Sequence, residues 1–101
     1  MKIATEKENG TLTITLSGKL DTTSAPELEK ALTEQADGVT SLVFDLGELS
    51  YTSSAGLRVF LKARKMMRSR DDVRLIHTAP SVLEVLEMTG FTEIMTVETA
   101  E

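Results

Sequence analysis

The sequence contains no cysteine, no tryptophan and one histidine, His77, among its 101 residues. Without cysteine, the chain has no disulfides, thiol nucleophiles or thiolate metal ligands. A single histidine also leaves too few nitrogen donors for most zinc sites. We therefore expect neither a metal nor a cofactor.

Long apolar runs are absent as well, since seven consecutive apolar residues occur nowhere. A bilayer-spanning helix of about 20 apolar residues and the apolar core of a secretory signal are therefore not expected. We expect a cytoplasmic protein without membrane insertion. The net charge of −5, from 16 acidic and 11 basic residues, also argues against nucleic-acid binding, which depends on neutralising phosphates.

The composition is that of one folded domain, residues 1–101. Hydrophobic residues make up 41% of the chain and charged residues 27%, close to globular averages. Seven of the 11 basic residues lie between positions 58 and 74, so the charge is uneven along the chain. Arg58, Lys62 and Lys65 share one helical face, which is most often simply a solvated surface.

The chain is predicted to open with a β-hairpin. Residues 11–16 alternate polar and apolar side chains, the pattern of a half-buried strand. Asn9 and Gly10 precede this strand and suit a tight turn with positive φ angles, so residues 2–8 are the expected antiparallel partner.

The rest of the chain is predicted to alternate helices and strands. Ser24 and Glu27 form a capping box for a helix that ends near residue 37, and residues 41–46 form an apolar central strand. Later elements are a helix over 54–70, a strand over 73–77, a helix over 81–88 and an edge strand over 93–97. Crossovers of this length predict an α/β fold with a mixed sheet, an N-terminal antiparallel hairpin and then parallel strands, covered by three to four helices.

The stretch of residues 45–57 is predicted to be a loop that leads from the central strand into the second helix. Function often lies at this edge of parallel sheets. Ser54 is placed at the helix start, where a serine most often only caps the helix. The same position would also hold a phosphoryl group near free backbone amides and the positive end of the helix dipole.

Three segments together resemble the signature of STAS domains, specifically free-standing anti-sigma factor antagonists. They are residues 18–21 (Gly-Lys-Leu-Asp), residues 44–46 (Phe-Asp-Leu) and, above all, residues 51–57 (Tyr-Thr-Ser-Ser-Ala-Gly-Leu). Residues 79–83 and 88–91 match the last helix of the family and its glycine stop. The resemblance runs nearly end to end.

The resemblance implies partner switching. In the family, the unphosphorylated protein binds an anti-sigma factor that is also a serine kinase, which frees a sigma factor, and phosphorylation ends the complex. A serine phosphatase is expected to reverse the reaction. The acceptor serine of the family corresponds to Ser54, with Ser53 as the fallback, because Ser53 stands where many members carry aspartate. The partner-binding residues implied are Asp21, Thr22, Thr23, Ser53, Ser54, Gly56 and Leu57.

Two other functions remain open from the sequence. A STAS module can act as a scaffold in another signalling or lipid-transport assembly. A small serine hydrolase would need Ser54 and His77 to meet at the sheet edge, but the chain lacks the first glycine of the G-x-S-x-G motif. We therefore expect a binding protein without catalytic residues.

Overall fold

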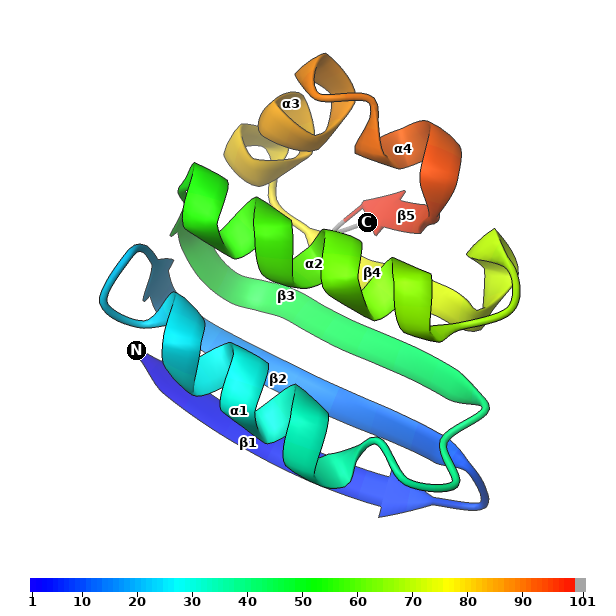
Figure 1. Ribbon diagram of the computed structural model, residues 1–101. Coiled ribbons are helices and arrows are strands. Elements are labelled where there is room, and N and C mark those ends of the chain that lie inside the picture. Colours follow the sequence, from blue (N-terminus) through cyan, green and yellow to red (C-terminus); the bar gives the residue numbers. More distant parts are fainter. Residues whose placement is uncertain (100–101) are drawn as a thin grey trace.

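The chain alternates strands and helices around one sheet in the computed structural model, which describes residues 1–99 (Figure 1). The elements are β1 (Lys2–Glu8), β2 (Thr11–Leu20), α1 (Ala25–Gln35), β3 (Ser41–Thr52), α2 (Ser54–Met66), the 3-10 helix η1 (Arg70–Asp72), β4 (Val73–Thr78), α3 (Pro80–Met88), α4 (Phe91–Ile94) and β5 (Thr96–Thr99). The predicted α/β order of elements is confirmed.

Within residues 1–99, five strands form a single mixed sheet in the order β1-β2-β3-β4-β5. β1 pairs antiparallel with β2, whereas the β2–β3, β3–β4 and β4–β5 pairs are parallel. The turn between β1 and β2 has φ angles of 52° at Asn9 and 82° at Gly10, as the hairpin prediction requires. β3 lies in the middle of the sheet, which confirms the position expected for the central strand.

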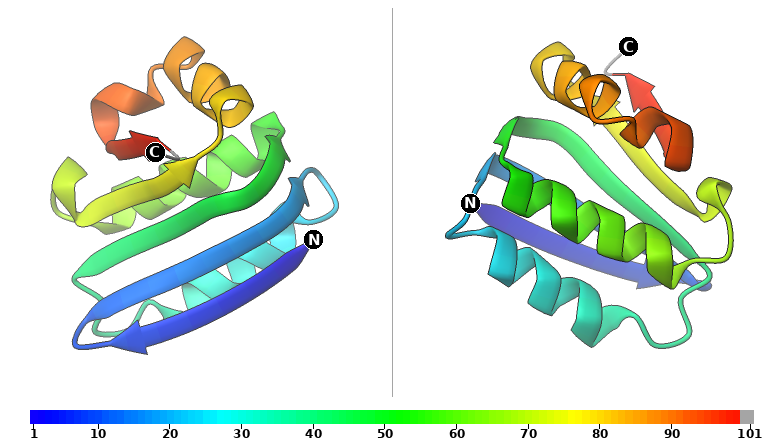
Figure 2. Two further views of the ribbon diagram at one scale, coloured as in Figure 1. Left: turned by 180° about the vertical axis from the view of Figure 1, so that it is seen from behind. Right: turned by 45° about the horizontal axis from the view of Figure 1, so that its top comes forward.

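One face of the sheet carries the core. Helices α1 and α2 lie side by side over this face, while the view from behind looks onto strands that neither helix covers (Figure 2). Side chains alternate between the two faces along each strand. On β2 the fully buried residues Leu12, Ile14 and Leu16 face the helices, and the half-buried residues Thr11 and Thr13 face the other way.

The predicted loop after the central strand is wrong, because β3 continues to Thr52. The pairing of β2 with β3 shifts register twice in this region, so the strand bends without ending. Gly47 and Glu48 interrupt the apolar pattern that marked the strand in the sequence. Leu49 and Thr52 nevertheless turn back into the interior, where both are buried.

The second helix ends at Met66, four residues before the predicted end at Arg70. Met67 adopts an extended backbone, and its amide donates to the carbonyl of Arg64. The guanidinium of Arg64 donates to the carbonyl of Ile94 (2.6 Å), which ties this end of α2 to the C-terminal region. No glycine or proline marks this end, so the sequence alone extends the helix too far.

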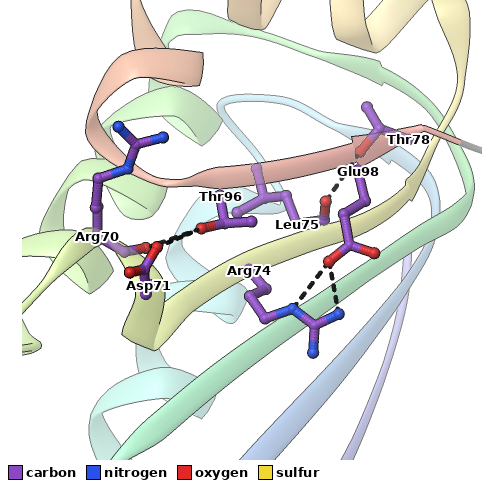
Figure 3. A network of polar contacts seen from close by, with 7 residues as sticks. All are labelled: Arg70, Asp71, Arg74, Leu75, Thr78, Thr96 and Glu98. Atoms are coloured by element: carbon purple, nitrogen blue, oxygen red, sulfur yellow. Dashed lines mark hydrogen bonds and ion pairs between the residues drawn. The ribbon is translucent and has the colours of Figure 1, made fainter.

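The predicted edge strand over residues 93–97 is displaced, since α4 occupies Phe91–Ile94 and β5 begins at Thr96. Gly90, with φ 80°, separates α3 from α4 in the left-handed conformation expected for it. Polar contacts hold β5 in place (Figure 3). Arg74 donates to the Glu98 carboxylate at 2.9 and 2.5 Å, and the Thr96 hydroxyl donates to the Asp71 carboxylate at 3.3 Å.

No helix in residues 1–99 has the length and apolar character needed to cross a membrane. The same residues contain no group of three or more histidine, cysteine, aspartate or glutamate side chains arranged to hold a metal ion.

Candidate functional site

The start of α2 and the loop after β2 form one corner of the molecule. Leu20 pairs with Thr52 in the sheet, and the amide of Ser53 donates to the carbonyl of Leu20 (2.8 Å). Residues 21–24 and residues 53–54 therefore leave the sheet side by side, at the same end of β2 and β3 (Figure 1). The structure thus brings together the two segments in which the sequence placed the site.

Ser54 is the first residue of α2, and its side chain is exposed. The expectation that Ser54 caps the helix is wrong, because Ser53 occupies the cap position with an extended backbone. The first backbone amides of a helix have no partner within the helix, and they carry the positive end of its dipole. A phosphoryl group on Ser54 would therefore lie in water next to a favourable electrostatic environment.

Ser53 is less accessible to water than Ser54. It is half-buried, and its Oγ atom is buried without a hydrogen-bond partner among the described residues. It also makes no side-chain cap to α2. Of these two neighbouring hydroxyls, the one on Ser54 is open to water and the one on Ser53 is enclosed.

Asp21 organises the loop after β2. One of its carboxylate oxygens accepts from the backbone amides of Thr23 and Ser24, both at 3.0 Å. These two backbone hydrogen bonds, the Ser24 bond first, hold the pKa of Asp21 below its usual value. Thr22 and Thr23 are exposed at the tip of the loop.

Ser24 has a role that the sequence did not reveal. The predicted capping box with Glu27 is wrong, because Ser24 makes no side-chain cap to α1. Its hydroxyl instead donates to the carbonyl of Lys19 and accepts from the amide of Asp21, both at 2.9 Å. Ser24 is buried, so these bonds fix the loop in the shape that exposes Thr22 and Thr23.

Gly56 and Leu57 lie in α2 shortly after Ser54, and both pack toward the interior of the protein. Gly56 is buried, and a Cβ atom there would lie 2.4 Å from the Thr52 hydroxyl and 2.6 Å from the Leu20 side chain. The glycine therefore allows α2 to approach the ends of β2 and β3, and Gly56 itself lies beneath the surface. Leu57 is half-buried and packs against the core.

A groove of about 570 Å³ begins beside this corner and runs between α1 and α2. Its lining near the site comprises Thr22, Ala55 and Arg58, and further along it includes Glu29 and Lys30. The groove combines apolar and charged groups. Sequence reasoning missed it, because the groove exists only where two helices lie side by side.

His77 interacts with Asp45 and not with Ser54. Its Nδ1 atom lies 3.0 Å from the carboxylate of Asp45, on the neighbouring strand. Burial raises the pKa of Asp45, but the hydrogen bonds from His77 and Gly47 outweigh it and leave this pKa below its usual value. Among residues 1–99 no hydrogen bond joins Ser54 to His77, so the pair that a serine hydrolase needs is not formed there.

Comparison with known proteins places these features in a family. A model of the STAS domain matches residues 2–101. The chain is 40% identical over 99 residues to BtrV of Bordetella bronchiseptica, a protein named as an anti-sigma factor antagonist, and the match covers 96% of this chain and 85% of BtrV.

Solved structures show the same fold. An anti-sigma factor antagonist from Mycobacterium paratuberculosis superimposes with a TM-score of 0.85 at 22% identity, covering 96% of this chain and 84% of that one. The phosphorylated form of SpoIIAA from Bacillus superimposes with a TM-score of 0.72 at 19% identity, covering 97% and 92%. From the family match, the close relative and the shared fold, we conclude that this chain belongs to the STAS domain family, together with proteins that are anti-sigma factor antagonists.

Proposed function

We propose that this protein is an anti-sigma factor antagonist controlled by phosphorylation of Ser54. The unphosphorylated protein binds an anti-sigma factor that is also a serine kinase, and this binding frees a sigma factor in the cytoplasm. A serine phosphatase restores the unphosphorylated form. The observation that carries the proposal is the exposed hydroxyl of Ser54 at the start of α2, beside the loop of residues 21–24.

The contact surface of the proposed complex comprises this loop, the start of α2 and the adjoining groove. Thr22 and Thr23 supply exposed hydroxyl groups, and Asp21 supplies a carboxylate whose pKa is held below its usual value by its backbone hydrogen bonds. The groove between α1 and α2 gives the partner a concave surface that begins at Ala55, the residue after Ser54. A partner bound here would cover the acceptor and also hold it for phosphorylation.

Phosphorylation follows from ordinary group-transfer chemistry. The Ser54 oxygen attacks the γ-phosphorus of ATP held by the kinase, and a P–O bond forms as the bond to the β-phosphate oxygen breaks. ADP leaves with the electron pair, and the hydroxyl proton passes to a base of the kinase.

The added charge is sufficient for a switch. A phosphoserine carries nearly two negative charges at neutral pH, and an unpaired charge in a desolvated contact costs several kcal/mol. A tenfold loss of affinity needs only about 1.4 kcal/mol. Phosphorylation of one serine therefore ends binding without changing the fold.

The first experiment maps the acceptor. The protein is incubated with ATP and each candidate serine-kinase anti-sigma factor, and the phosphorylated peptide is identified by mass spectrometry. We expect the label on Ser54 in the native protein and in Ser53→Ala, and no label in Ser54→Ala. Ser53→Ala is a matched control because its hydroxyl has no hydrogen-bond partner to lose. A label on Ser53, or none with any candidate, contradicts the proposal, and the second outcome favours a scaffold role in another assembly.

The second experiment measures affinity for the same partner. We expect Ser54→Ala to bind as the native protein does, and Ser54→Asp to bind at least about tenfold more weakly because it places a charge in the contact. Isothermal titration calorimetry gives both constants. Equal affinities for the two variants would contradict the switch.

A further inference from the structure

Arg58 lies one helical turn after Ser54 on α2. Residues four apart share a face of a helix, with Cβ atoms about 5–6 Å apart. Long side chains in a helix point back toward its N-terminus and cover the preceding turn. The guanidinium of Arg58 can therefore reach the turn that carries Ser54.

Arg58 has no other partner in the part of the chain that the structure describes. It is exposed and forms no ion pair or side-chain hydrogen bond within residues 1–99. Lys62, the next basic residue of α2, is already paired with Glu29 at 3.3 Å, and Arg64 donates to the carbonyl of Ile94. Among these three residues, Arg58 combines proximity to Ser54 with a side chain free to bind a new group.

The order of the two residues favours an interaction. A negative group four positions before a positive one on a helix is the more stabilising orientation. An anion at Ser54, the first residue of α2, also complements the positive end of the helix dipole. A guanidinium presents a planar fork of donors that matches phosphate oxygens. A phosphoryl group on Ser54 would supply the anion that Arg58 lacks.

We propose that Arg58 binds the phosphoryl group carried by Ser54 and thereby leaves the groove between α1 and α2. This inference rests on the proposed phosphorylation of Ser54. It gives Arg58 a role in both the unphosphorylated and the phosphorylated protein. In the unphosphorylated protein Arg58 lines the groove and is available to the partner. In the phosphorylated protein it turns back to the phosphoryl group, so the partner loses this contact as well.

The test uses the full chain with phosphoserine incorporated at position 54 during synthesis, so it needs no kinase. A phosphorus-31 NMR titration measures the second pKa of the phosphoserine, which is about 6 without a partner. We expect this pKa to be lower by about 0.2–0.4 of a unit in the protein with Arg58 than in Arg58→Gln. Arg58→Lys, which keeps the charge but not the fork, should fall between the two.

The matched control is Lys65→Gln, which removes one positive charge from the same helix. Lys65 lies about 16 Å along the axis from Ser54, beyond the screening length of about 8 Å at physiological salt. We expect this variant to leave the phosphoserine pKa unchanged.

A second readout is thermal unfolding with and without the phosphoryl group. Phosphorylation should raise the melting temperature more in the native background than in Arg58→Gln, and this difference isolates the interaction of the pair. Identical phosphoserine pKa values in the native protein and Arg58→Gln would overturn the inference but leave the proposed function intact. Failure of the kinase experiments would overturn the proposed function without changing this measurement.

Discussion

The two faces of the sheet are built in different ways. The face under α1 and α2 is packed with fully buried apolar side chains, among them Phe44 and Phe60. The opposite face carries threonines, the Asp45–His77 pair and the Arg74–Glu98 ion pair, all at least partly accessible to water. The comparison teaches that the covered face supplies most of the buried apolar area that stabilises the fold and holds α2 in place. The opposite face keeps polar and charged side chains in contact with water.

The largest expected loss of stability comes from removing a large side chain at the centre of the covered face. Phe60 is fully buried, and its ring meets Phe44 edge to face with centroids 5.1 Å apart. Phe60→Ala should lower the free energy of unfolding by about 3–5 kcal/mol, because it removes buried area and leaves a cavity. Urea unfolding measures the change. Thr13→Ala, which alters a half-buried side chain on the opposite face, is the comparison, and an equal loss in both variants would contradict the difference between the faces.

The next effect concerns the contact of α2 with the strand ends. Gly56→Ala places a methyl group within 2.6 Å of the Leu20 side chain, so either the helix or this buried side chain must shift. We expect a loss of about 1–3 kcal/mol in the free energy of unfolding. Ser54→Ala, on the exposed side of the same turn, should change it by less than about 0.5 kcal/mol. A neutral Gly56→Ala would show that the approach of α2 is looser than described.

A smaller effect is expected in how the folding stability contributed by Asp21 and by Asp45 depends on pH. The pKa values of Asp21 and Asp45 are both lowered in the folded protein. Each group therefore stabilises the fold fully above its unfolded value near 3.8, and this contribution is lost as the pH falls through the folded value. Asp21→Asn and Asp45→Asn should each be less stable than the native protein at neutral pH and approach it in acid. Urea unfolding across this range tests both, and a pH-independent difference would contradict the assignment.

The smallest effect is expected at the edge of the sheet. Glu98→Gln removes the charge that pairs with Arg74, and the side chains of both residues are 44–46% exposed. An exposed pair of this kind contributes about 0–1 kcal/mol and less at high salt. Thermal unfolding at low and high salt should show a small difference that salt removes. A loss of several kcal/mol would mean that β5 depends on this ion pair.

Local patterns predicted the parts of the fold that depend on local chemistry. The hairpin at Asn9 and Gly10 and the stop at Gly90 were found because each needs a positive φ angle that few residues adopt. The central strand was found from its apolar run. The end of β3 and the end of α2 were missed, since bends in paired strands and contacts such as Arg64 with Ile94 leave no local signal.

The candidate site divides in the same way. The segment around Ser54 was found from its resemblance to the family, and the structure adds that Ser54 is exposed while the Ser53 oxygen is enclosed. The hydrogen bonds of Ser24 to Lys19 and Asp21, and the groove that Arg58 lines, were not visible before the helices were placed.

By itself, the sequence determined the order of the main strands and helices, the hairpin and the apolar core. These depend on residue type and spacing along the chain, which are local properties. Only the tertiary structure decided which of two adjacent hydroxyls faces water, how closely α2 approaches Leu20 and what lines the groove. Those depend on segments that are distant in sequence and meet only when the sheet and its helices pack together.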